Sequence, residues 1–183
     1  MDSTLMTIIG IVVAVILLFI WPLMAITERN DDIAQITVQT LTTEFVDKIA
    51  IAGCIKPSDY EAFQQKLAAT GNTYEIEIEV QHLDENPGKK SAITSGNLIG
   101  ENVRYSTFTS EILDYMYYEE DGVLKQRAYP LNKGDNVIMT AKNTNITMAD
   151  VMRTAWYKIS GKGTPQVTGS ASSMALNSYK SNN

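Results

Sequence analysis

The stretch LMTIIGIVVAVILLFIWPLMAI, residues 5–26, decides the fold of this chain. Its 22 residues carry no charge, and an α-helix of that length is roughly 33 Å long, close to the hydrocarbon core of a bilayer at about 30 Å. Asp2 precedes the stretch and Glu28 follows it, while Trp21 lies near its second end, where indole rings favour the membrane interface. The pattern predicts a transmembrane helix over 5–26, behind a tail of residues 1–4.

A cleaved signal peptide is the main alternative to a retained anchor. Signal peptides have a basic first segment, an apolar stretch of about 7–15 residues and a small-x-small cleavage site. No Lys or Arg precedes Leu5, and cleavage after Ala25 would place Leu23 where a small side chain is preferred. The core helix of a soluble protein is a weaker alternative, because a wholly apolar helix of 22 residues has no polar face to present to water. A retained single-pass anchor in the cell membrane is therefore favoured.

The orientation of the anchor follows from the lengths of its flanks. Basic residues near a span usually mark the cytoplasmic side. Arg29 and Lys48 are the only basic residues within about 20 residues of the span, and both follow it. They stand among five acidic residues, however, and a tail of four residues is too short to form a cytoplasmic module. We therefore expect the main domain outside the cytoplasm, in contact with the lipid bilayer only through its anchor.

The length, net charge and residue counts of the chain exclude several classes of protein. A length of 183 residues allows one anchor and one domain. The net charge of −6 is spread along the chain without a basic cluster, so nucleic acid is not an expected partner. Cys54 is the only cysteine and His82 the only histidine, which excludes an internal disulfide and the usual Cys/His zinc sites. Stability must therefore come from packing.

A second helix pattern follows the anchor directly. After Asp32, apolar residues recur every three to five positions, the spacing of one helix face, and Gly53 ends the pattern. We expect a stalk helix over residues 27–53 that continues the anchor. Its apolar stripe is the candidate surface for helix packing and assembly, and its residues are Ile33, Ile36, Leu41, Phe45 and Ile49.

The remaining pattern, over residues 54–176, indicates an α+β domain. From Thr73 to Leu83 apolar residues alternate with Glu and Gln, which predicts a strand buried on one face. On this strand His82 falls on the apolar side, where we interpret it as a satisfied core histidine. A second strand is expected from Asn136 to Lys142 and extended chain over 123–131 and 166–176. Polar residues 177–183 form a tail.

Three short helices complete the expected domain. Ser58 is the expected N-cap of the first, with Glu61 as its reciprocal partner and Gly71 as the stop. The second is expected from Thr109 to Tyr118 and the third from Thr147 to Ile159. With turns and a long loop over residues 84–102, the prediction is a small, mainly antiparallel sheet with short helices behind one long N-terminal helix.

No catalytic, cofactor or metal site is evident from the residues. Nucleophilic catalysis needs Ser or Cys beside a base, and the single histidine lies in a predicted strand without a nearby Gly-x-Ser-x-Gly motif. The Gly161–Thr164 segment lacks the first glycine of a phosphate-binding loop, since Trp156 stands near that place. We therefore expect a protein that is not an enzyme, with no cofactor and no evident small-molecule substrate.

A family resemblance is carried by five stretches, at residues 44–47, 59–63, 74–82, 133–135 and 147–157. With the expected layout of one long helix and a small sheet, they resemble the pilin-like, TadE-type proteins encoded with Tad pilus or secretion genes in Gram-positive anaerobes. The resemblance implies a structural or assembly role in a pilus or secretion apparatus, self-association or other apparatus subunits as partners, a surface filament, and no catalytic residues. One position departs from type IV pilins, which carry Glu five residues after a processing glycine, whereas Val15 stands at that place after Gly10.

An anchored sensor or ligand-binding module is the alternative function. Its pocket would be formed by the Ser/Gly/Asn-rich loop at 91–102 and by the tyrosines Tyr115, Tyr117 and Tyr118. An enzyme ranks third, because an acidic pair brought together only by the fold leaves no pattern in the sequence.

Overall fold

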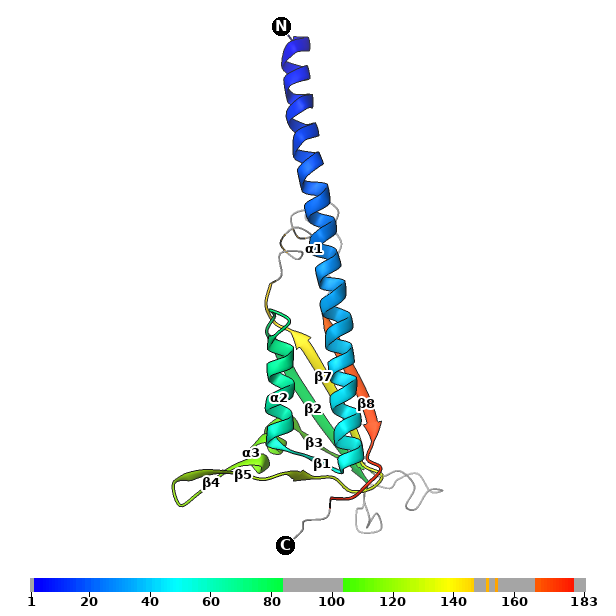
Figure 1. The fold of residues 1–183 in the computed structure, drawn as a ribbon, viewed down its shortest axis with the longest axis vertical. Helices are drawn as coiled ribbons and strands as arrows, with labels where there is room; N and C mark the ends of the chain where they lie inside the picture. Colours follow the sequence, from blue (N-terminus) through cyan, green and yellow to red (C-terminus); the bar gives the residue numbers. More distant parts are fainter. Residues whose placement is uncertain (1, 84–103, 147–150, 152–153, 155–166, 180–183) are drawn as a thin grey trace, which may run out of the picture.

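The computed structural model describes residues 2–83, 104–146, 151, 154 and 167–179. The predicted helix from Thr147 and the predicted loop at 84–102 lie wholly or largely outside these residues. The described chain is an α+β protein in which a long N-terminal helix is followed by small antiparallel sheets and short helices, as the sequence predicts (Figure 1).

Helix α1 runs without interruption from Asp2–Ala52, 51 residues, and passes through Pro22. The predicted anchor and stalk are therefore one continuous helix. Its first half is long and apolar enough to cross a membrane, and none of its most apolar window is buried within the chain. The N-terminal half stands clear of the domain, while the C-terminal half lies along the sheet (Figure 1).

The main sheet has four antiparallel strands in the order β3-β2-β7-β8. The predicted strands appear as β2, Tyr74–Leu83, at the second place and β7, Asn136–Asn143, at the third. The edges are β3, Arg104–Phe108, and β8, Thr168–Met174. The segment at 104–108 was not predicted as a strand, because its residues show no clear alternation.

One face of this sheet is covered by α1, with α2, Pro57–Ala68, beside it (Figure 1). The other face points to solvent and carries the glutamates of β2, as the alternation predicts. The apolar layer between helices and sheet is the core of the domain. Its largest fully buried side chains are Val38, Val46, Ile49, Ile55, Leu67, Ile78, Val80, Ile112, Met116, Leu131, Val137 and Met139.

Gly169 lets β8 approach α1 closely. A Cβ atom placed on this residue would lie 2.8 Å from Val38 Cγ1 and 2.9 Å from both Thr42 Oγ1 and the Val38 carbonyl oxygen. Contacts this short do not occur for real Cβ atoms. The helix can therefore lie against this part of β8 only because residue 169 has no side chain.

Two local predictions are wrong. Helix α3 spans Thr109–Met116 and ends before Tyr117, which opens a hairpin of β4, Tyr117–Glu120, and β5, Val123–Gln126. The turn residues Asp121 and Gly122 both have positive φ, 54° and 73°, as a two-residue hairpin turn of type I′ requires.

The start of α2 also differs from the prediction. Lys56 occupies the N-cap position without a side-chain hydrogen bond, and Pro57 opens the helix. Proline suits that place because its fixed φ is already helical and its missing N–H would have no partner in the first turn. A short sheet of β1, Cys54–Ile55, and β6, Tyr129–Pro130, closes the base of the domain.

Candidate assembly surface

The five residues of the predicted assembly stripe divide into two groups. Phe45 and Ile49 are buried in the core of the domain, at 5% and 0% exposure. Ile33 and Ile36 are 55% and 67% exposed. Leu41, between the two groups, is partly buried against the core. The exposed part of the stripe is therefore the part nearest the apolar N-terminal half of α1.

A groove lies between α1 and α2. Its floor includes Leu41 and the stacked rings of Phe45 and Phe63, whose centroids lie 4.7 Å apart. Lys48 and Asp59 form an ion pair of 2.9 Å on its rim. The groove has a volume of about 220 Å³. Phe45 and Phe63, which line it, also belong to the hydrophobic core of the domain.

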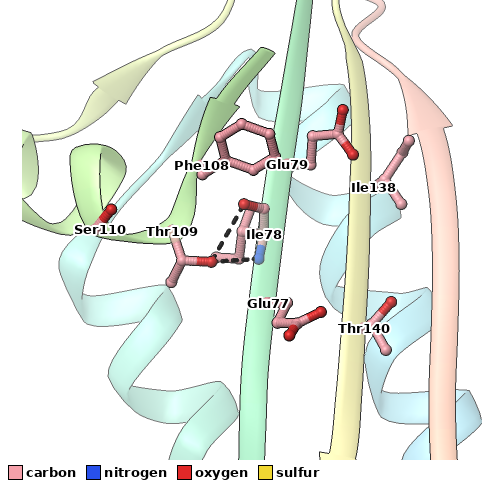
Figure 2. A pocket seen from close by; sticks show the side chains of 8 residues that line it. All are labelled: Glu77, Ile78, Glu79, Phe108, Thr109, Ser110, Ile138 and Thr140. Carbon is pink, nitrogen blue, oxygen red and sulfur yellow. Dashed lines mark hydrogen bonds between the residues drawn. The ribbon is translucent and has the colours of Figure 1, made fainter.

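The solvent face of the sheet carries a wider and open hollow of about 540 Å³. Figure 2 shows Glu77 and Glu79 of β2 beside Phe108 at the end of β3, with Ile138 on the neighbouring strand. Hydrogen bonds from Ser106 and Gln81 lower the pKa of the Glu79 carboxyl. The hollow is acidic on one side and apolar on the other.

Thr109 ends the pairing of β2 with β3 at the edge of this hollow. Its hydroxyl accepts a hydrogen bond from the Ile78 N–H at 2.7 Å and donates to the Ile78 carbonyl at 3.2 Å (Figure 2). A threonine side chain thus takes the place of the next residue of a neighbouring strand. Strand β3 stops here, and α3 begins.

His82 lies inside the domain with both ring nitrogens bonded. Nδ1 lies 2.7 Å from Asp135 Oδ2 and Nε2 lies 2.8 Å from Tyr129 Oη. The three residues are between 1% and 8% exposed. The interpretation as a satisfied core histidine is confirmed. Because the cluster is closed to solvent, it is a structural link between β2, β6 and the start of β7.

Asp135 is the centre of that link. Its carboxylate also accepts hydrogen bonds from the backbone N–H groups of Asn132, at 2.8 Å, and Leu83, at 3.3 Å. Burial raises the pKa of the Tyr129 phenol, and the charges of nearby groups, including Asp135, raise it further against a hydrogen bond from Thr107. Tyr129 therefore stays protonated as a neutral partner of His82.

The tyrosines that the sequence suggested for a ligand pocket instead contact other residues of the domain. The Arg127 guanidinium lies 3.7 Å above the ring of Tyr115 and 4.6 Å from that of Tyr118. Tyr117 donates a hydrogen bond of 3.0 Å to Glu61 on α2. These contacts hold the base of the β4–β5 hairpin against the domain.

Two glutamines of α1 close part of the outer edge of β8. Gln35 Oε1 accepts a hydrogen bond from the Thr168 N–H at 2.8 Å, and its amide nitrogen donates to the Thr168 carbonyl. Gln39 accepts from the Ser170 N–H at 3.1 Å and donates to the Ser170 carbonyl at 2.7 Å. Each side-chain amide therefore pairs with one edge residue as a peptide group of another strand would.

The spacing of these glutamines fits the strand. Four residues of helix rise about 6 Å and two residues of strand about 6.7 Å, so side chains at i and i+4 can meet edge groups at j and j+2. We name the pair Gln35 and Gln39 the glutamine clasp. The sequence analysis missed it, since polar residues on an exposed helix face are ordinary.

Comparisons with known proteins add no assignment. No protein-family model, curated protein or solved structure matches this chain. Among the residues that the structure describes, no group of three or more His, Cys, Asp or Glu side chains is placed to hold a metal ion.

Proposed function

We propose that this protein is a membrane-anchored, pilin-like structural or assembly subunit of a pilus or secretion apparatus, with its main domain outside the cytoplasm. The observation that carries the proposal is the continuity of α1. One helix is both the apolar N-terminal segment and a wall of the domain core, with no linker between them.

This continuity has a mechanical consequence. Val38, Val46 and Ile49 of α1 are at most 1% exposed, so the helix cannot turn independently of the sheet. The domain therefore has a fixed orientation relative to its anchor. A fixed orientation suits a subunit that packs in an ordered array, whereas a tethered ligand-binding module gains nothing from it.

The free part of the stripe supports packing as the activity. Ile33 and Ile36 lie beyond the acidic residues that follow the anchor, so they face water while the chain is alone. Exposed apolar side chains on a rigid helix favour contact with another protein surface. The resemblance to TadE-type proteins suggests that such a contact would join subunits of a pilus or secretion apparatus.

Electron microscopy of the full-length protein extracted from membranes, with its intact mass, tests the proposal. We expect ordered filaments or higher-order assemblies. A double variant Ile33→Gln, Ile36→Gln is expected to shift the distribution toward monomer. The matched control is Val123→Gln, Leu124→Gln, which replaces two exposed apolar residues of the β4–β5 hairpin, away from this helix face. A wild-type protein that stays a detergent-bound monomer at every concentration would contradict the proposal.

A further inference from the structure

The outer edge of β8 is covered by α1 at its two ends and open between them. The backbone groups of alternate residues point outward from an edge strand, and the glutamine clasp binds those of the first two, up to Ser170. Farther along the same edge, the Leu176 N–H donates to the Ala50 carbonyl of α1 at 3.0 Å. The described part of the chain provides no hydrogen-bond partner for the outward groups of the two residues between, Ser172 and Met174.

This open edge lacks the usual protection. Natural edge strands are commonly guarded by charged side chains, proline or bulges. The sequence of β8, Thr-Gly-Ser-Ala-Ser-Ser-Met, contains no charge and no proline, and its pairing with β7 runs without a bulge. Free N–H and C=O groups on such a strand are a template for another strand. The edge therefore favours a partner that supplies backbone groups.

Helix α1 continues beside the open edge but carries no amide side chain there. The clasp uses two α1 residues four positions apart, and two further steps of four place Thr43 level with Ser172 and Asp47 level with Met174. Both of these α1 residues are exposed. The Thr43 hydroxyl donates to the Gln39 carbonyl of its own helix at 2.8 Å. The clasp thus stops where the open groups begin.

The two sides of the open edge differ in chemistry. Ser172 lies opposite Ile138, which lines the hollow on the solvent face of the sheet, and Met174 points to the same face and is 51% exposed. On the other side stands Asp47, which forms no ion pair within the described part of the chain. A strand added here would have an apolar neighbour on one side and an acidic neighbour on the other.

We propose that the open edge of β8 binds an extended segment of a partner protein as a further, antiparallel strand. Its aliphatic residues lie opposite Ser172 and Met174, and a lysine or arginine opposite Ser173 faces Asp47. Antiparallel pairing gives each of the two edge residues two hydrogen bonds to a single partner residue. The contact lies away from the exposed part of the stripe on α1, so it does not depend on self-assembly of this chain.

A short synthetic peptide tests the pairing directly. The probe is Thr-Val-Lys-Val-Thr with blocked ends and a fluorescent label. Its binding to the full-length protein in detergent is measured by fluorescence anisotropy. We expect saturable binding, and a failure to bind up to millimolar peptide would overturn the proposal. Peptide affinity that falls as the protein concentration rises would show that a second copy occupies the edge, and would overturn the assignment to another protein.

Methylated peptides show which backbone groups are used. N-methylation of both valines removes the two N–H groups that point toward β8, whereas N-methylation of the lysine removes one that points away. Because each lost hydrogen bond costs about 1 kcal/mol, we expect a roughly tenfold or greater loss of affinity from the first change and little loss from the second. Equal affinities of the two methylated peptides would overturn the proposal.

A longer clasp tests the site from the side of the protein. Thr43→Gln places an amide level with Ser172, where it can bind the edge as Gln39 binds Ser170. We expect roughly tenfold weaker peptide binding, with a Tm no lower than that of the wild type. Thr40→Gln is the matched control, because it makes the same substitution at an exposed position on another side of α1. Equal peptide affinities of the two variants would overturn the proposal.

The charge of Asp47 is tested with a second peptide, Thr-Val-Gln-Val-Thr, in which an uncharged residue replaces the lysine. We expect Asp47→Asn to weaken binding of the lysine peptide several-fold and to leave binding of the glutamine peptide unchanged. This difference separates recognition of the basic residue from a general effect on the edge. An equal effect of the substitution on the two peptides would overturn the assignment of a basic partner residue.

Discussion

Substitution of Gly169 by alanine tests the close packing of α1 on β8. The new Cβ would meet Val38 Cγ1 at 2.8 Å and the Val38 carbonyl oxygen at 2.9 Å. The first contact can be relieved by a rotation of the valine side chain, but the second involves helix backbone. Gly169 has no positive φ, so alanine fits the local backbone and the effect is steric.

The expected cost follows from two opposing effects. Overpacking a well-filled core typically costs about 1–3 kcal/mol. Replacement of glycine by alanine at a compatible backbone position stabilises by about 0.4–1 kcal/mol, because it restricts the unfolded chain. We therefore expect Gly169→Ala to lower the free energy of unfolding by about 1–2 kcal/mol, which corresponds to a fall in Tm of roughly 2–8 °C for a domain of about 150 residues.

Thermal unfolding of the full-length protein in detergent, followed by circular dichroism, measures this change. The double variant Gly169→Ala, Val38→Ala is the control, because removal of the valine methyl groups should cost less when alanine already occupies position 169. A Tm of Gly169→Ala equal to or above that of the wild type would refute the close approach of α1 and β8.

Three further predictions concern buried or shielded ionisable groups. Asp135→Asn removes the charge at the centre of the His82 link, and we expect a loss of about 2–3 kcal/mol in urea unfolding; an unchanged midpoint would contradict the link. Burial, with the hydrogen bond to Glu61, raises the pKa of Tyr117 to about 12, so its stabilising effect is present below pH ~10 and is lost as the pH rises through about 12. An ultraviolet titration in which Glu61→Gln leaves the Tyr117 pKa unchanged would oppose this account. Burial also raises the pKa of the Cys54 thiol, so we expect no reaction with a thiol reagent before unfolding, and a rapid reaction of the native protein would contradict it.

The elements with a strong hydrophobic period could be predicted from the sequence. The alternation from Tyr74 to Val80 predicted β2 and the direction of its glutamates, because a half-buried strand must separate apolar and polar residues by face. The unbroken apolar run and the stripe after it predicted α1. In both cases burial imposes a period on consecutive residues, and the period is visible without knowledge of the partner.

The hairpin after α3 could not be predicted in the same way. Tyr117 and Tyr118 continue the apolar spacing of the helix, and the acidic residues after them are common at a helix end. The hairpin forms because Arg127, Gln126 and Glu61 hold its base, and two of these contacts cross many residues of sequence. Local spacing carries no information on such partners.

The stripe on α1 shows the same limit for the candidate site. Spacings of three to five residues grouped Ile36 with Phe45, but nine residues turn an α-helix through about 900°, so the two side chains point to opposite sides of α1. The domain covers Phe45 and the nearby Val38, while Ile36 faces water. Irregular spacings of three to five residues therefore do not by themselves define one helix face.

The glutamine clasp is a long-range contact whose spacing can be recognised in the sequence. Gln35 and Gln39 are four residues apart, and that spacing on a helix is close to the spacing of alternate residues on a strand. A sequence with an uncharged edge strand such as β8 needs some other block on its edge, and paired amides on a neighbouring helix provide the required donors and acceptors. Because the clasp ends at Ser170, it protects only the first part of the outer edge of β8. The same two side chains thus join the helix to the sheet and cover backbone groups that an edge strand would otherwise expose.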